Sequence, residues 1–299
     1  MSNNSDKVNL GSILSVAIDA SQKAGTVIRQ VWKSGKLGVE WKGVNDPMTE
    51  ADVQAQKLIF GLLYKAFGKD LPMVGEEDTD VPETEEIPNL NLLDQLKIPE
   101  EYKNVDKKEV CVFVDPLDAT REFVDGNLPA VMTLIGISYR GEAIAGVMFQ
   151  PFVGNDDDSN GTTIYGMLGM GTNVPVKARD EKDFVIATTR SHATEFLEKA
   201  TQAVKADRVV KVGGAGYKCL LVLRGEIDAY FFPIPGTKKW DTCGPEAIIK
   251  SAGGSFTDAH GRSIRYTIDT PKPNTDGLIV TLKGHDDILA KISSVLPKL

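Results

Sequence analysis

Residues 113–126 read FVDPLDATREFVDG and continue the apolar run VCVFV at residues 110–114. An apolar run of this length is typical of a buried strand, so two carboxylates, Asp115 and Asp118, stand where the strand should end. Pro116 fixes the backbone between them, and both acids therefore project from one tight turn. Two carboxylates this close repel each other and raise one pKa unless a cation lies between them. The pattern favours a site for a hard cation such as Mg²⁺, which prefers oxygen ligands.

A purely structural role is the alternative for these acids. Asp118 could cap the helix that begins near Thr120, because an aspartate side chain accepts hydrogen bonds from free N–H groups at a helix start. The spacing alone leaves both interpretations open.

The composition is that of a globular protein and argues against two classes of partner. The chain has 299 residues, 41% of them apolar and 25% charged, with a net charge of −8 and a pI near 5.1. Proteins that bind nucleic acid or membrane surfaces in general carry a basic patch, so neither partner is expected. No stretch reaches the roughly 20 apolar residues of a membrane span. A small anionic ligand stays compatible with this charge, because a metal can reverse the field in one cleft.

The cysteines and the first residues predict a cytoplasmic protein. Cys111, Cys219 and Cys243 are scattered through apolar or helical stretches without a CxxC pair, so we expect reduced thiols and no zinc site. The opening MSNNSDKVNL has no apolar core of the kind found in a signal peptide.

Hydrophobic periodicity divides the chain into two parts. Helices are predicted at residues 10–33 and about 50–67. Three strands are predicted after them, VCVFV, AVMTLIGIS and EAIAGVMFQ. The stretch VGNDDDSNG that follows is the most loop-like in the chain. We therefore expect an α+β domain at residues 1–158 and an α/β domain at residues 159–299.

Two further regions have a characteristic pattern. Residues 77–109 are acidic and interrupted by prolines, and we expect a long surface excursion with one short helix near residues 90–96. In the last part of the chain, strands alternate with helices predicted at residues 193–206, 215–224 and 244–252. This alternation predicts crossover connections between strands.

Three more acids stand at strand ends or helix starts. Glu76 follows the apolar LPMV, Asp52 comes three residues after Thr49, and Asp241 directly precedes the helix at 244–252. Each has a structural alternative, a solvated acidic loop for Glu76 and helix capping for Asp52 and Asp241. Helix N-termini also favour phosphate, through their free N–H groups. Acids for a metal beside N–H groups for a phosphate predict metal-assisted phosphoryl transfer.

Two polar segments are candidates for holding the rest of a substrate. VGGAGYKC, at residues 212–219, lacks the Ser or Thr after Lys218 and the glycine spacing that a P-loop or a dinucleotide-binding turn needs. What remains is a tight turn whose lysine either reaches an anion or is solvated. The segment ATTRSH ends another strand with Thr189 and His192, for which we expect a binding role.

Four motifs together resemble a known superfamily. In chain order they are DPMTEAD at 46–52, GEED at 75–78, DPLDATREF at 115–123 and WDTCGPE at 240–246. They resemble the motifs of the lithium-sensitive, magnesium-dependent phosphatases, which include inositol monophosphatase, fructose-1,6-bisphosphatase and inositol polyphosphate 1-phosphatase. The segments TTRSH, GGAGYK and KKWDTCGPE are most similar to the 3′(2′),5′-bisphosphate nucleotidase branch. The resemblance covers about residues 42–262.

The resemblance implies the layered α-β-α-β-α sandwich of the sugar phosphatases and a role for each matching residue. Two or three Mg²⁺ ions would be bound by Glu76, Asp115, Asp118, Asp241 and the carbonyl of Leu117. The attacking water would be oriented and deprotonated with the help of Thr120 and Asp52, and Glu76 counts among the catalytic residues too. The nucleotide would be held by Thr189, His192, Gly214 and Lys218. The first domain would thus bind metal and the second would bind nucleotide.

Two residues depart from the family pattern. Ala119 replaces the glycine usual in DGT, which excludes a backbone conformation that only glycine could hold. Gly244 stands where alanine is commoner. We expect small geometric effects from both.

The activity implied by the resemblance is removal of the 3′-phosphate from adenosine 3′,5′-bisphosphate, which leaves AMP and phosphate. Inhibition by Li⁺ and a side activity on inositol 1,4-bisphosphate are implied as well. Two alternatives stay open, an inositol polyphosphate 1-phosphatase or inositol monophosphatase, and a phosphate-binding protein without catalysis. The complete set of acids together with Thr120 argues against the last.

Overall fold

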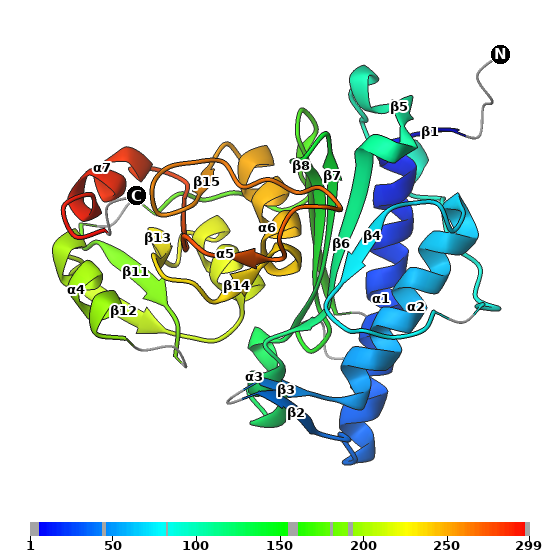
Figure 1. Ribbon diagram of the computed structural model, residues 1–299, viewed down its shortest axis with the longest axis horizontal. Helices are drawn as coiled ribbons and strands as arrows, with labels where there is room; N and C mark the ends of the chain where they lie inside the picture. Colours follow the sequence, from blue (N-terminus) through cyan, green and yellow to red (C-terminus); the bar gives the residue numbers. More distant parts are fainter. Residues whose placement is uncertain are drawn as a thin grey trace.

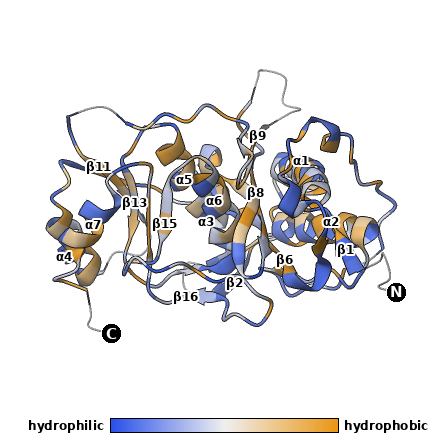
Figure 2. Ribbon diagram, turned by 90° about the horizontal axis from the view of Figure 1, so that it is seen from above, coloured by the Kyte–Doolittle hydropathy of each residue, from blue (hydrophilic) through white to orange (hydrophobic). Residues whose placement is uncertain are grey.

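The protein is built from alternating layers of helices and sheets. The computed structural model describes residues 6–43, 46–81, 83–154, 161–179, 182–190 and 194–296. Over these residues two helices, a sheet, two helices, a second sheet and two helices follow one another (Figure 1). The view from above shows the same order (Figure 2). The predicted α-β-α-β-α sandwich is therefore confirmed. Within the described ranges, no helix combines the length and hydropathy needed to cross a membrane.

The first layer consists of α1 (Leu10–Ser34) and α2 (Glu50–Phe67), which pack against each other and against the first sheet. The Asn9 side chain accepts the N–H of Gly11 at 2.8 Å, which caps the start of α1. The helix ends at Gly35, whose φ of 67° is left-handed and is typical of a helix C-terminus. Both helices agree with the predicted ranges.

The first sheet has six strands in the order β10-β9-β8-β7-β6-β4. Its strands are β4 (Met73–Gly75), β6 (Val110–Asp118), β7 (Met132–Tyr139), β8 (Glu142–Gln150), β9 (Thr162–Met167) and β10 (Gly171–Thr172). Strand β4 runs parallel to β6, and the other neighbours are antiparallel. All nine residues of β6 are buried, because helices cover both faces of this sheet (Figure 1). A strand covered on both faces is continuously apolar, as VCVFV is.

The middle layer consists of α5 (Ala215–Leu223) and α6 (Lys239–Ser251). Helix α6 begins five residues before the predicted start at residue 244. The prediction was wrong because it took Asp241 for a residue preceding the helix. Asp241 instead lies in the first turn, and Pro245 is tolerated further inside the helix.

Facing glycines bring α6 into backbone contact with the first sheet. A Cβ atom added to Gly244 of α6 would lie 2.8 Å from the carbonyl oxygen of Ile135, and one on Gly146 of β8 would collide with the carbonyl of Gly244. A Cβ on Gly136 of β7 would collide with the backbone nitrogen of Gly244. The departure from alanine at position 244 therefore has a packing reason in this chain.

The second sheet has five strands in the order β12-β11-β13-β17-β15. Its strands are β11 (Val185–Thr188), β12 (Arg208–Lys211), β13 (Ala229–Phe232), β15 (Ser255–Thr257) and β17 (Leu278–Thr281). Strands β12, β11 and β13 are parallel, and β17 and β15 are antiparallel to their neighbours. Helices α4 (Glu195–Val204) and α7 (His285–Ile292) form the last layer. The predicted alternation of strands and helices is confirmed.

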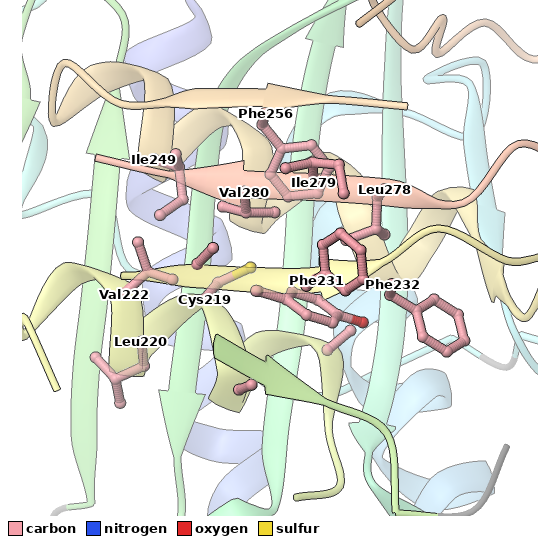
Figure 3. Packing of buried hydrophobic residues seen from close by; sticks show 14 of the residues in the cluster. Cys219, Leu220, Val222, Phe231, Phe232, Ile249, Phe256, Leu278, Ile279 and Val280 are labelled. Atoms are coloured by element: carbon pink, nitrogen blue, oxygen red, sulfur yellow. The ribbon is translucent and has the colours of Figure 1, made fainter. Parts of the chain in front are cut away.

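The core between α5, α6 and the second sheet is apolar. Figure 3 shows Cys219 of α5 and Ile249 of α6 facing Phe231 of β13 and Val280 of β17. This packing holds the start of α5 and the start of α6 at one end of the middle layer.

The remaining elements are short. The two-stranded pairs are β1 (Lys7–Val8) with β5 (Val105–Asp106), β2 (Glu40–Gly43) with β3 (Asp46–Met48), and β14 (Thr237–Lys238) with β16 (Pro273–Asn274). Helix α3 (Thr120–Val124) follows β6, and the 3₁₀ turn η5 (Leu128–Ala130) precedes β7. The region 77–109 holds the 3₁₀ turns η2 (Leu93–Gln95), η3 (Glu100–Tyr102) and η4 (Lys107–Glu109). The single short helix expected near residues 90–96 is therefore only a 3₁₀ turn, with two more after it.

The domain division expected at residue 158 stays a prediction. Residues 155–160 of the loop VGNDDDSNG lie outside the described residues. Strands β9 and β10, which follow that loop, pair within the first sheet. If the chain does consist of two units, this pairing favours a boundary between Thr172 and Val185.

Candidate active site

Three of the predicted metal-binding acids meet at one point. Carboxylate oxygens of Glu76, Asp115 and Asp241 all lie within 4.8 Å of one another. Glu76 follows β4 and Asp115 lies near the end of β6. Because these two strands are parallel, their carboxyl ends share one edge of the sheet. Asp241 reaches the same edge from the first turn of α6.

The acids lie among like charges, with Asp115 buried and Glu76 and Asp241 half-buried. Burial raises the pKa of Asp115 well above its ordinary value, and the nearby carboxylates of Glu76, Asp118 and Asp241 raise it further. Burial and then Glu76 raise the pKa of Asp241 to about 8. The negative charge on each carboxylate raises the free energy of its charged neighbours. A converging set of carboxylate oxygens of this kind fits a hard divalent cation.

Lys42 of β2 contacts this cluster, and the sequence analysis did not identify it. Its Nζ lies 2.9 Å from Oε1 of Glu76 and 2.9 Å from Oε1 of Glu77. Burial lowers the pKa of Lys42, but the charges and hydrogen bonds of Glu76 and Glu77 outweigh it and raise the pKa overall. Nothing in the sequence pairs these residues, because the contact depends on how the β2–β3 hairpin folds over the end of β4.

Asp118 lies apart from the three clustered acids and faces α5. Its two oxygens accept the backbone N–H groups of Ala215 at 3.0 Å and Gly216 at 2.8 Å. The capping interpretation was thus right about the chemistry and wrong about the helix, since Asp118 caps α5 and not α3. Burial raises its pKa, and Lys218 and the two N–H groups partly oppose that rise. Its predicted part in metal binding stays a prediction.

The turn after β6 positions Leu117 and Thr120. The Asp115 carboxylate accepts the N–H of Leu117 at 3.0 Å, and the hydroxyl of Thr120 lies 2.9 Å from the Leu117 carbonyl oxygen. Between them, Ala119 has φ 71° and ψ 42°. This left-handed conformation is one that alanine reaches at a cost of about 1–2 kcal/mol, so the turn does not need a glycine-only conformation.

Asp52 makes the contacts that both of its expected roles require. Its Oδ2 accepts the backbone N–H of Thr49 at 2.8 Å and the Thr49 hydroxyl at 2.6 Å, as a capping acid would. Its Oδ1 lies 3.1 Å from the hydroxyl of Thr120. Burial raises the pKa of Asp52 to about 7, although both bonds from Thr49 lower it. Helix capping therefore leaves one oxygen for Thr120.

These residues line one cleft of about 380 Å³. The predicted residues on its wall are Glu76, Asp115, Leu117, Asp118, Thr120, Thr189, Gly214, Lys218 and Asp241. Asp52 lies behind Thr120, and His192 is outside the described residues. Three aromatic residues, Tyr230, Phe232 and Trp240, line the cleft as well. They are buried, but they also face the cleft.

Lys218 is neither solvated nor extended into the cleft. Its side chain is buried, and its Nζ donates to the carbonyl oxygens of Gly214 at 2.5 Å and Val212 at 3.3 Å. The ammonium also lies 4.8 Å from the ring centre of Tyr230. Burial lowers its pKa to about 8, and the negative charge of Asp118 partly opposes that. In this arrangement Lys218 holds the glycine-rich turn before α5.

Other cations of the cleft differ in their partners. Arg190 pairs with Glu122 and Asp125 at 3.0 Å each, and Arg121 pairs with Asp125 at 3.1 Å. The ammonium of Lys238 instead lies over the ring of Trp240, 5.3 Å from its centre. Among the described residues of the wall, Lys218 and Lys238 are the cations without an ion pair to an acidic side chain, although the charge of Lys238 lowers the pKa of Asp241.

The comparisons with known proteins identify the family. The Inositol monophosphatase family matches residues 9–295, and the chain belongs to it. It is 41% identical to the 3′(2′),5′-bisphosphate nucleotidase 1 of Dictyostelium discoideum, over 94% of this chain and 96% of that protein. It is 38% identical to the human protein of the same name, over 94% of each.

Solved structures agree with the fold. The extragenic suppressor protein suhB from Bartonella henselae superposes with a TM-score of 0.71 at 23% identity, over 96% of this chain and 98% of that one. CysQ from Bacteroides thetaiotaomicron, a bacterial member of the inositol monophosphatase family, gives 0.67 at 22% identity, over 91% and 98%.

The raised pKa values predict how the stability of the metal-free protein depends on pH. Asp52 and Asp241 have folded pKa values near 7 and 8, above the ordinary 3.8. The folded state therefore keeps protons that the unfolded chain loses above about pH 4, and this stabilisation is lost as the pH rises through 7 to 8. We expect the metal-free melting temperature to fall between pH 5 and pH 8 in thermal unfolding, and Asp241→Asn to flatten that fall.

Adding Mg²⁺ should reverse this loss at pH 8. Ligand at 100 times its Kd stabilises a fold by about 2.7 kcal/mol, or roughly 5 °C for a chain of this size. The shift should be smaller at pH 5, where protons occupy the acids. An unchanged melting curve at pH 8 with millimolar Mg²⁺ would contradict the proposed cluster.

Proposed function

We propose that this protein is a Mg²⁺-dependent phosphatase that removes the 3′-phosphate of adenosine 3′,5′-bisphosphate, giving AMP and phosphate. The observation that carries the proposal is the convergence of Glu76, Asp115 and Asp241 in one cleft with the Asp52–Thr120 pair. The relatives at 41% and 38% identity, named as bisphosphate nucleotidases, support the substrate class.

The acids would hold the metal. Glu76, Asp115 and Asp241 would be ligands. Following the family resemblance, we add Asp118 and the Leu117 carbonyl, so that the full set would bind two or three ions. A bound Mg²⁺ activates the attacking water and stabilises the charge that develops on the leaving oxygen.

Thr120 and Asp52 would manage the proton of the attacking water. The Thr120 hydroxyl has one proton and two acceptors within reach, the Leu117 carbonyl and Asp52 Oδ1. When it donates to Asp52, its lone pairs face the cleft and accept a hydrogen bond from water. Asp52 can then take up the Thr120 hydroxyl proton at Oδ1 while Thr120 Oγ1 takes a proton from the water. A pKa of about 7 lets the Asp52 carboxyl exchange protons at neutral pH.

The remaining residues of the cleft wall would hold the rest of the substrate. Thr189 and Gly214 offer polar groups, and Tyr230, Phe232 and Trp240 offer flat apolar surface. Aromatic surface with a few polar groups suits a base and a ribose better than a small polyol. We include His192 in this subsite because of the family resemblance. The first part of the chain would thus supply most metal ligands, and the second part would supply the nucleotide subsite and Asp241.

The remaining details belong to the same proposal. We expect inhibition by Li⁺ and a side activity on inositol 1,4-bisphosphate. We also expect a cytoplasmic enzyme, which the three buried, unbridged cysteines support. A mouse relative, 32% identical over 87% of this chain and 75% of that protein, is named as a Golgi-resident adenosine 3′,5′-bisphosphate 3′-phosphatase. Fractionation with an antibody tests the location.

A substrate panel tests the activity. With Mg²⁺ present, adenosine 3′,5′-bisphosphate should have a higher kcat/KM than inositol 1-phosphate, and 5′-AMP should accumulate without being consumed. Omission of Mg²⁺ should abolish phosphate release. A higher kcat/KM for an inositol phosphate would instead favour an inositol phosphatase, and no release from any substrate would favour a binding protein without catalysis.

Substitutions at Asp52 and Thr120 separate chemistry from capping. In Asp52→Asn the amide oxygen still accepts from Thr49, so helix α2 keeps its cap and the melting temperature should change little. Turnover should fall by roughly 10²-fold or more, the scale of general acid–base catalysis. Thr120→Ala should lose as much, and the double variant little more than either single one, since the two residues act together. Near-normal turnover in Asp52→Asn would leave Asp52 with its structural role only.

Lys218 and Lys238 are two candidates for binding the 5′-phosphate, which does not react. The sequence analysis placed Lys218 in the nucleotide subsite, but the buried contacts of Lys218 with backbone carbonyls favour Lys238 for this role. Lys238→Gln should raise KM for the nucleotide by about 10-fold and leave kcat nearly unchanged, because it binds a part that does not react. Lys218→Gln should lower the melting temperature, because it disturbs the buried hydrogen bonds of Lys218 with two backbone carbonyls. A KM effect confined to Lys218→Gln would restore the original assignment.

A further inference from the structure

A buried amide outside the cleft contacts the helix turn that carries Asp241. Asn274 lies on β16, and its backbone pairs with Thr237 of β14, just before α6 begins. The side chain is 5% exposed and is not among the residues that line the active cleft. None of the sequence motifs includes it.

The amide of Asn274 is within hydrogen-bond distance of four groups at the start of α6. Its Nδ2 lies 3.1 Å from the carbonyl oxygen of Lys238, 3.1 Å from Thr237 Oγ1 and 3.2 Å from Thr242 Oγ1. Its Oδ1 accepts from Lys239 Nζ at 2.5 Å. Two of these partners fix the orientation of the amide, because an ammonium only donates and a backbone carbonyl only accepts.

The same turn determines where the Asp241 carboxylate lies. The backbone N–H of Lys238 donates to Asp241 Oδ2 at 2.8 Å, so a movement of this peptide unit moves the carboxylate with it. Pro245 has no N–H to donate to the Asp241 carbonyl, so the turn lacks one helical hydrogen bond. The contacts of Asn274 supply side-chain bonds at this weakened turn.

We propose that Asn274 is a positioning residue for metal binding. It fixes the first turn of α6 and thereby holds the Asp241 carboxylate against Glu76 and Asp115. The inference rests on the proposed function, in which these acids bind Mg²⁺. Residues that orient metal ligands in this way usually contribute 10- to 100-fold to metal affinity.

Asn274→Asp tests the proposal because charge and positioning predict opposite results. The variant keeps the shape of the side chain and an acceptor for Lys239, but it places an oxygen opposite the Lys238 carbonyl. Extra negative charge alone would tighten Mg²⁺ binding, whereas a displaced turn weakens it. We expect Mg²⁺ affinity of the full metal-free chain, measured by calorimetric titration, to fall about 10-fold. Equal or tighter binding would overturn the proposal.

Ile249→Val is the matched control. Ile249 is also fully buried and lies further along α6. The loss of one methyl group should lower the melting temperature without changing Mg²⁺ affinity more than twofold. If Asn274→Asp does not fold, Asn274→Ser replaces it, since serine removes the Nδ2 donor without adding a charge. The same loss of affinity is expected, and its absence counts against the proposal.

Amide hydrogen exchange separates this inference from the proposed function. In the metal-free protein, residues 237–242 should exchange faster in Asn274→Asp than in the wild-type chain, and Ile249→Val should match the wild type there. If the wild-type chain binds no Mg²⁺, the proposed function fails whatever the exchange result. If it binds Mg²⁺ and Asn274→Asp exchanges and binds like the wild type, only the positioning role fails.

Discussion

Repulsion between converging carboxylates is the constraint that the structure around the cleft has to meet. Glu76, Asp115 and Asp241 converge within 4.8 Å, and the full burial of Asp115 and half-burial of the other two make their charges costly. The fold offsets this cost with local donors. Asp115 accepts the N–H of Leu117, Asp241 accepts the N–H of Lys238, and Glu76 pairs with Lys42. The acids are thereby held in place by the protein itself, so the metal binding that we propose for them would require little rearrangement.

The geometry of the cluster depends on how closely α6 approaches the first sheet. Asp115 is fixed by β6, whereas Asp241 belongs to a helix that could slide on its neighbours. The facing glycines Gly136, Gly146 and Gly244 put the helix backbone directly against β7 and β8, and such contact leaves little freedom along the sheet. In our proposal, Asn274 fixes the first turn of this helix, next to the position where Pro245 removes a backbone bond.

In this site the same acids make the structural contacts and have the proposed chemical roles. Asp52 caps α2 with one oxygen and contacts Thr120 with the other, and Asp118 caps α5 while it lines the cleft. A carboxylate held by backbone N–H groups has a fixed position, and rigid placement is what ligands and proton acceptors need. The two interpretations that the sequence left open for these acids therefore do not exclude each other.

The sequence by itself determined the elements and the acids of the site. The run VCVFV predicted β6, helical spacing predicted α1 and α2, and an acid at the end of an element marked Glu76, Asp115 and Asp241, because such signals are local. Tertiary structure alone decided which helix Asp118 caps, that Lys218 turns inward to backbone carbonyls, and that Lys42 and Asn274 contact the site at all. These contacts join residues that are 32 or more positions apart, or depend on which way a side chain turns inside a packed layer. No periodicity or motif encodes either, since both follow from how the layers pack.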